Sequence, residues 1–296
     1  MDWFNFKQVK VYYSVMKRVR KKINMSPSQT KRFTDKISSM VPTKHKKGDI
    51  LLINKITCEF FKQEQKTDRI LLHIHGGAFA FGSLNTHRGL LNYLFNNSSF
   101  DVISPEYSLT PDAPFPTALN EIIDVYKYLR KEFPMKKIFI SGDSAGGNLT
   151  TAMTLKLMDE KKTLPDGIIL LSPWMDLREE SIARKINNDK DSGFDADDLD
   201  EYANIYQVAS LRKQPLISPI VITDLKGFPP TLIQVATNEL LYTDSEIFAI
   251  NLNKSGVDCT FIQEDKLFHS WQLFPDYFTP AKKSLNEVIE FVSKQS

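Results

Sequence analysis

The chain has 296 residues, of which 42% are hydrophobic, and it carries only two cysteines. This length and composition allow one sizeable core, arranged as one large α/β domain or two small ones, and exclude a disordered or fibrous protein. Two cysteines are too few for a disulfide framework, which favours a reducing compartment. The net charge is only +2, but residues 1–50 carry 13 Lys and Arg residues against 3 Asp and Glu residues, so the remainder of the chain is acidic.

The basic N-terminal segment mixes aromatic and β-branched residues with seven Lys and Arg residues between Trp3 and Ile23. This composition is typical of a basic amphipathic helix, which either packs its apolar stripe on the rest of the protein or lies on an anionic membrane surface. We favour packing and keep weak membrane contact as the alternative. The acidic remainder of the chain argues against a nucleic-acid partner. A homodimer stays open.

The sequence also predicts where the protein resides. No apolar run approaches the 18–20 residues or so that are needed to span a bilayer, and the N-terminus lacks the apolar core and cleavage site of a signal peptide. We therefore expect a cytoplasmic protein.

Strand-like and helix-like segments alternate along the chain. Residues 49–63 are rich in apolar, β-branched and aromatic residues around a polar Asn54-Lys55, which predicts a pair of strands. Helical periodicity separates most of the later apolar runs, as in the spacing of apolar residues from Leu119 to Leu129. This alternation predicts an α/β fold with a mostly parallel central sheet and helices on both faces. The later runs predicted as buried strands are Ile70–His75, Val102–Pro105, Ile138–Ser141, Ile168–Leu171, Leu232–Ala236 and Thr260–Gln263.

The alternation fails between about residues 175 and 229, where the chain is acidic and helical in part. We interpret this stretch as an insertion. Its carboxylates do not form a calcium loop, because a loop with Gly193 at its sixth position would place Asn188, Lys190 and Leu199 where carboxylates are required. We expect no metal and no organic cofactor.

The sequence Gly142-Asp143-Ser144-Ala145-Gly146 lies between a predicted strand and a predicted helix. A Gly-x-Ser-x-Gly turn in this context exposes a nucleophilic serine on a strained backbone, and its glycines allow the strand and helix to approach closely. We therefore identify Ser144 as the candidate nucleophile.

A serine nucleophile needs a base, and the base needs a carboxylate that fixes its tautomer. In a strand–turn–helix site of this kind the chain order is serine, acid, histidine. Only His269 among the five histidines follows Ser144, so it is the candidate base. Three carboxylates follow the strand that ends at Ala236. We favour Glu239, which lies three residues past the strand end, over Asp244, which is placed to cap the next helix, and Glu246.

The transition state also needs hydrogen-bond donors for the oxyanion. The turn His75-Gly76-Gly77 follows a predicted strand, as an esterase oxyanion loop does. We expect the backbone N–H groups of Gly76 and Gly77 to join that of Ala145.

These motifs resemble those of the hormone-sensitive-lipase family of α/β-hydrolases, which includes many bacterial carboxylesterases. The resemblance covers roughly residues 68–290. It implies an α/β-hydrolase fold, oxyanion donors at Gly76 and Gly77, and an acid at Glu239, a position that holds Asp or Glu in the family. Beside the two turns, it rests on Glu106–Pro116, Leu171–Trp174, Ser218-Pro219 and Phe228–Val235.

The same resemblance implies a helical cap over the site. The cap corresponds to an N-terminal segment, residues 1–48, and to an insertion at about residues 175–215 within a catalytic domain of residues 49–296. Phe79, Trp174 and Trp271 are candidate pocket residues, although aromatic residues at such positions belong to the core about as often. Ala78 stands where the family motif often has a third glycine.

The sequence therefore predicts a serine carboxylesterase that hydrolyses small ester substrates through an acyl-enzyme. A preference for short acyl chains follows from the resemblance alone. The competing hypothesis is a small-molecule binding protein on the same scaffold without catalysis, against which the three candidate triad residues argue.

Overall fold

The computed structural model describes residues 45–181, 186–188, 190–191, 193–277 and 279–295, together with residues 26, 29–33 and 36. The amphipathic segment predicted between Trp3 and Ile23 lies outside the described residues, as does most of the N-terminal segment of the expected cap. Among the described residues, no helix is long and apolar enough to cross a membrane.

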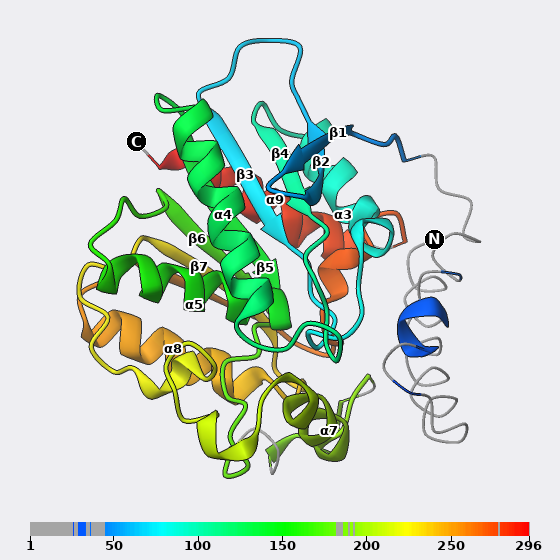
Figure 1. The fold of residues 1–296 in the computed structure, drawn as a ribbon, viewed down its shortest axis with the longest axis vertical. Coiled ribbons are helices and arrows are strands. Elements are labelled where there is room, and N and C mark those ends of the chain that lie inside the picture. Colours follow the sequence, from blue (N-terminus) through cyan, green and yellow to red (C-terminus); the bar gives the residue numbers. More distant parts are fainter. Residues whose placement is uncertain are drawn as a thin grey trace.

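The described residues form an eight-stranded sheet in the order β1-β2-β4-β3-β5-β6-β7-β8 (Figure 1). The two N-terminal strands form a hairpin that joins the sheet antiparallel to β4, and the other strand pairs are parallel. The fold is thus α/β, as predicted. The strands are β1 (Asp49–Ile53), β2 (Ile56–Phe61), β3 (Arg69–Ile74), β4 (Asp101–Pro105), β5 (Lys137–Asp143), β6 (Gly167–Leu171), β7 (Thr231–Ala236) and β8 (Cys259–Glu264).

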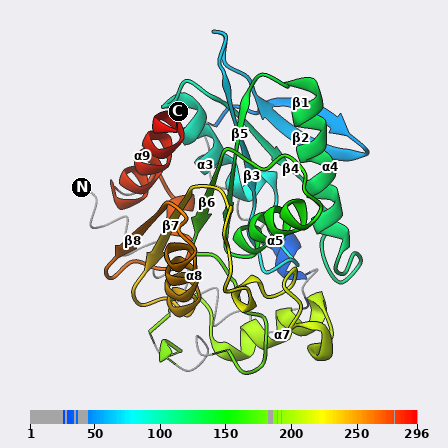
Figure 2. The same cartoon turned by 90° about the vertical axis from the view of Figure 1, so that its left-hand side faces the viewer.

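Helices cover both faces of the sheet (Figures 1 and 2). On one face lie α4 (Thr117–Glu132), α5 (Ala145–Asp159) and α8 (Tyr242–Lys254); on the other lie α3 (Leu84–Asn96) and α9 (Thr279–Lys294). Strand residues alternate between two cores, because successive side chains of a strand point to opposite faces. In β3, for example, Ile70 and Leu72 belong to the core under α4 and α5, whereas Leu71 belongs to the core under α3 and α9.

The predicted insertion lies between β6 and β7. It contains the helix α7 (Ala196–Tyr206) and the short 3₁₀ turns η1 (Ala209–Leu211) and η2 (Pro219–Val221), and α7 lies beyond one end of the sheet (Figure 2). The carboxylate of Asp195 caps α7 by accepting the N–H of Asp198 at 3.1 Å, and the Asp198 carboxylate accepts the N–H of Asp195 at 3.0 Å. This reciprocal capping stabilises the start of α7 within the acidic stretch.

Candidate active site

Ser144 lies in a tight turn between β5 and α5. Its backbone angles are φ 51° and ψ −120°, a conformation that costs free energy for a residue with a side chain. The turn holds this conformation through hydrogen bonds from the Ser144 N–H to Leu171 O (2.9 Å) and from the Trp174 N–H to Ser144 O (3.0 Å). Gly146 has to be glycine, because an added Cβ would lie 2.1 Å from Ile74 O. The strain is therefore built into the fold and presents the serine hydroxyl.

Glu239 and His269 form a buried pair. The turn after β7 carries Glu239 and the loop after β8 carries His269, and the distance from Glu239 Oε2 to His269 Nδ1 is 2.7 Å. The other carboxylate oxygen, Oε1, accepts the Ser172 hydroxyl and the Ala236 N–H, each at 2.8 Å. These bonds fix the carboxylate, which in turn fixes the imidazole ring.

The environment of His269 favours its charged form. Burial of the ring lowers its pKa, but the hydrogen bond and negative charge of Glu239, with smaller contributions from Asp191 and Asp143, outweigh burial and raise the pKa above its ordinary value. An imidazole of this kind is stabilised once it has taken a proton.

Asp244, the other candidate acid, has a different neighbourhood. It lies in the first turn of α8, where Leu241 and not Asp244 is the N-cap residue, so the expected capping role was wrong. Its Oδ2 atom accepts the N–H groups of Met175 (3.0 Å) and Asp176 (2.9 Å). Asp244 therefore anchors the start of the insertion.

Ser144 and His269 line one small cavity. Its wall is mostly apolar, and Asp191 is one of the lining residues. The lining residues are Ala78, Ser144, Trp174, Asp191, Phe194, Leu199, Leu240, Leu241 and His269.

Two of the three aromatic residues expected in the pocket do not line this cavity. The Phe79 ring is buried and stacks on Tyr206 of α7 with 3.8 Å between ring centroids. Trp271 is fully buried in the small core of residues 236, 267, 268 and 281, where its indole N–H donates to Ser284 Oγ at 3.0 Å. Both residues pack in the interior, whereas Trp174, the third candidate, lies at the cavity wall.

The loop after β3 differs from the expectation at one donor. The Gly76 N–H donates to Asp143 Oδ1 at 2.8 Å, so it is not free to bind an oxyanion. At the next position Gly77 has φ 120°, and an added Cβ would lie 2.1 Å from Phe81 O, so only glycine fits. Among the described residues, no acceptor binds the N–H groups of Gly77 and Ala78. Since Ala78 lines the cavity with Ser144, it replaces Gly76 as a candidate donor.

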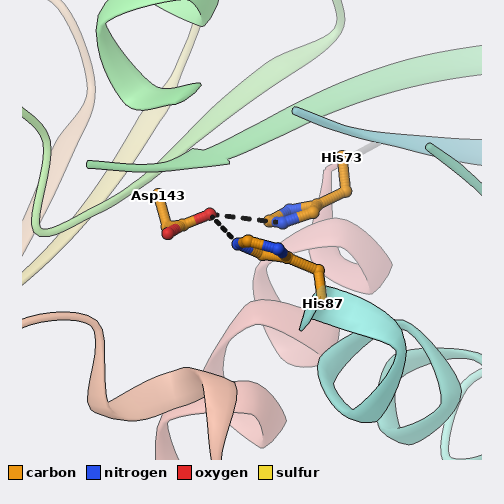
Figure 3. Close-up of side chains that lie close together, drawn as sticks. All are labelled: His73, His87 and Asp143. Carbon is orange, nitrogen blue, oxygen red and sulfur yellow. Dashed lines mark ion pairs between the residues drawn. The ribbon is translucent and has the colours of Figure 1, made fainter. Parts of the chain in front are cut away.

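Asp143 is the centre of a buried network that the sequence analysis missed (Figure 3). Its Oδ1 atom lies 3.1 Å from His87 Nε2 and 3.5 Å from His73 Nε2. Burial alone would raise the pKa of Asp143, but these histidines hold it well below its usual value. Oδ2 accepts the hydroxyl of Ser270, the neighbour of the candidate base, at 3.4 Å. The network thus joins the turn of Ser144, the loop after β3 and the loop of His269.

The composition of this network also suits a metal, because each of the three side chains offers a ligand atom and these atoms lie within 4.8 Å of one another. The Gly76 N–H nevertheless donates to Asp143 Oδ1 at 2.8 Å, and the Gly76 nitrogen also lies 3.3 Å from His87 Nε2. A donor hydrogen therefore occupies the direction that a cation needs. The cluster fits a hydrogen-bond network and not a metal site.

Comparison with known proteins identifies the family. A family model described as the alpha/beta hydrolase fold matches residues 71–273. A crystal structure of an esterase from the bacterial hormone-sensitive-lipase family superposes with a TM-score of 0.88 at 26% identity, covering 97% of each chain. The chain belongs to the hormone-sensitive-lipase family of α/β-hydrolases. This confirms the resemblance that the sequence motifs indicated.

Two relatives extend the comparison to function. An esterase of Acinetobacter venetianus is 32% identical over 283 residues, which cover 93% of this chain and 92% of the relative. An acetyl-hydrolase of Streptomyces hygroscopicus is 30% identical over 239 residues, which cover 80% of each chain. The protein is accordingly a serine ester hydrolase that acts on carboxylic esters.

Proposed function

We propose that Ser144, His269 and Glu239 form the catalytic triad of this esterase. The observation that carries the proposal is the 2.7 Å contact between His269 Nδ1 and Glu239 Oε2, made by a histidine that lines the same cavity as Ser144. With Nδ1 bound to the carboxylate, Nε2 is the ring nitrogen that takes the serine proton. The bonds of Asp244 to the N–H groups of Met175 and Asp176 argue against it in this role.

Acylation begins when Ser144 Oγ attacks the ester carbonyl carbon while its proton passes to His269 Nε2. The carbonyl oxygen becomes an oxyanion, which the N–H groups of Gly77, Ala78 and Ala145 stabilise. The bond from the carbonyl carbon to the alcohol oxygen then breaks. The alcohol leaves with the proton of His269 Nε2, and an acyl-serine remains.

Deacylation repeats these steps with water. His269 Nε2 takes a proton from water as the oxygen attacks the acyl carbon, and the same three N–H groups bind the second oxyanion. The bond to Ser144 Oγ then breaks and the serine recovers its proton from the imidazolium. The carboxylic acid product leaves the cavity.

We propose further that the preferred acyl group is short. The cavity beside Ser144 is small, and its apolar wall suits a short alkyl chain. The names of two relatives, an acetyl-hydrolase and an acetyl esterase, point the same way. The segment between β6 and β7 contributes Asp191, Phe194 and Leu199 to the wall, which supports its assignment as part of a cap.

The test is hydrolysis of p-nitrophenyl esters from acetate to decanoate by the wild type, by Ser144→Ala and by Ser293→Ala, a control on exposed α9. We expect wild-type turnover that falls with chain length, a loss of about 10⁴-fold or more in kcat for Ser144→Ala, and no change for Ser293→Ala. Thermal melts check folding. Residual turnover in Ser144→Ala near the wild-type level would rule out Ser144 as the nucleophile.

A further inference from the structure

The turn that carries Glu239, residues 237–240, is held from the side of the insertion. Asn187 Nδ2 donates to Glu239 O at 2.8 Å and to Thr237 O at 3.2 Å. The Leu240 N–H donates to Asp191 Oδ2 at 3.0 Å. Asn187 and Asp191 are both buried, being 3% and 7% exposed. Two side chains of the insertion thus bind the backbone on both sides of the Glu239 carboxylate.

The same Asp191 carboxylate also orders the residue that packs on the base. Its Oδ1 atom accepts the N–H groups of Gly193 (2.7 Å) and Phe194 (3.2 Å). The Phe194 ring meets the His269 ring edge-to-face, with 5.4 Å between centroids and 88° between planes. Asp191 therefore contacts both the turn that carries Glu239 and the loop whose Phe194 packs on His269. Along the chain, Glu239 lies about 50 residues and His269 about 80 residues after Asp191.

We propose that Asp191 is a positioning residue of the triad, brought by the insertion to hold residues 237–240, and hence Glu239, in register with His269. This inference rests on the proposed function. Among the described residues, Asp191 accepts the backbone N–H groups of Gly193, Phe194 and Leu240 through its two oxygens, whereas an asparagine has one acceptor oxygen. In an Asp191→Asn variant, the side-chain NH₂ group must face either the N–H of Leu240 or the N–H groups of Gly193 and Phe194. The hydrogen bonds on that side are then lost.

A change in pH dependence separates this role from simple packing. The charged groups that face His269 are Glu239 from the turn after β7, Asp143 from the end of β5, and Asp191 from the insertion, and all three raise its pKa. The base must be neutral to accept the serine proton. Loss of the Asp191 charge destabilises the imidazolium, so the acid limb of the pH–rate profile moves to lower pH, and a loosened Glu239 contact moves it the same way.

The experiment measures kcat, KM and the pH profile of p-nitrophenyl acetate hydrolysis in wild type, Asp191→Asn, Asn187→Ala and Asp195→Asn. Asp195 is the matched control, because it is a carboxylate of the same insertion whose helix-capping bond an asparagine reproduces. We expect Asp191→Asn to lower kcat about 10- to 100-fold with KM changed less, and to move the acid limb to lower pH. Asn187→Ala should lower kcat and move the acid limb of the pH profile less than Asp191→Asn does. Asp195→Asn should match wild type in kcat, KM and pH profile.

Three outcomes overturn the inference: kcat and the acid limb unchanged in Asp191→Asn, a rise in KM without loss of kcat, or an equal effect in Asp195→Asn. If Asp191→Asn does not fold, Asn187→Ala decides, and a kcat within about twofold of wild type overturns the proposal. Absence of wild-type turnover would instead refute the proposed function itself.

Discussion

Replacing Glu239 by Gln tests the triad at its least exposed member. The variant keeps the size of the side chain, and its amide oxygen can still accept the Ser172 hydroxyl and the Ala236 N–H. The amide nitrogen, however, faces His269 Nδ1 at the position of the present 2.7 Å contact and donates to it. The ring proton then moves to Nε2, the atom that must accept the proton of Ser144.

The expected magnitude follows from this tautomer change. A carboxamide in place of the carboxylate of a serine triad lowers kcat by about 10⁴-fold, which corresponds to about 5 kcal/mol of transition-state stabilisation. Folding should be largely preserved, because the two bonds to Oε1 are retained. The loss should therefore appear in kcat and not in the urea unfolding midpoint.

Asp244→Asn is the matched variant, since it makes the same chemical change at the other candidate acid. Its single amide oxygen can accept both N–H groups that Oδ2 accepts at present, those of Met175 and Asp176, at a cost of about 1–2 kcal/mol in the free energy of unfolding. The assay compares kcat per folded molecule with p-nitrophenyl acetate. A larger loss of turnover in Asp244→Asn than in Glu239→Gln would refute the assignment.

Three further results are expected. Because Glu239 raises the pKa of His269, kcat/KM should fall at acid pH with a midpoint above the ordinary histidine pKa of about 6.5. A midpoint below that value would contradict the raised pKa. Leu199→Ala should enlarge the cavity wall and raise the kcat/KM of the hexanoate ester relative to the acetate about tenfold, and an unchanged ratio would show that Leu199 does not limit chain length. His87→Leu should lower the free energy of unfolding by about 3–5 kcal/mol in urea, because the buried Asp143 carboxylate loses its partner at 3.1 Å, and a loss under about 1 kcal/mol would argue that the pair is not compensating that charge.

The sheet could be predicted from the sequence because its strands are short apolar runs bounded by turns. The run predicted at Ile70–His75 is observed as β3, Arg69–Ile74, and the apolar spacing from Leu119 to Leu129 corresponds to the buried face of α4. Ser144 and His269 could be singled out because a local turn marks the first and chain order leaves only the second. Both signals, a local turn motif and the order of residues along the chain, can be read from the sequence alone.

The errors arise where groups distant in sequence meet. The Gly76 N–H donates to Asp143, which lies 67 residues later in the chain. The parallel pairing of β3 with β5 brings the two residues together. Trp271 looks like a pocket residue beside His269, yet its side chain points to α9. The role of Asp191 depends on how the insertion folds back over the turn after β7. One local feature could have indicated the Asp143 network. Asp143 is an ionisable residue within the Gly-x-Ser-x-Gly turn, at a position with little room for water.

The order of strands in the sheet has a consequence for folding. The segments that meet at the cavity follow β3, β5, β6, β7 and β8, and His269 follows the strand at the far edge, which is also the last of the described strands. A chain in which β8 has not yet paired holds the proposed nucleophile, Ser144, without the proposed base, His269. Recovery of hydrolysis after dilution from denaturant should therefore require the docking of β8, so that enzyme activity reports completion of the sheet.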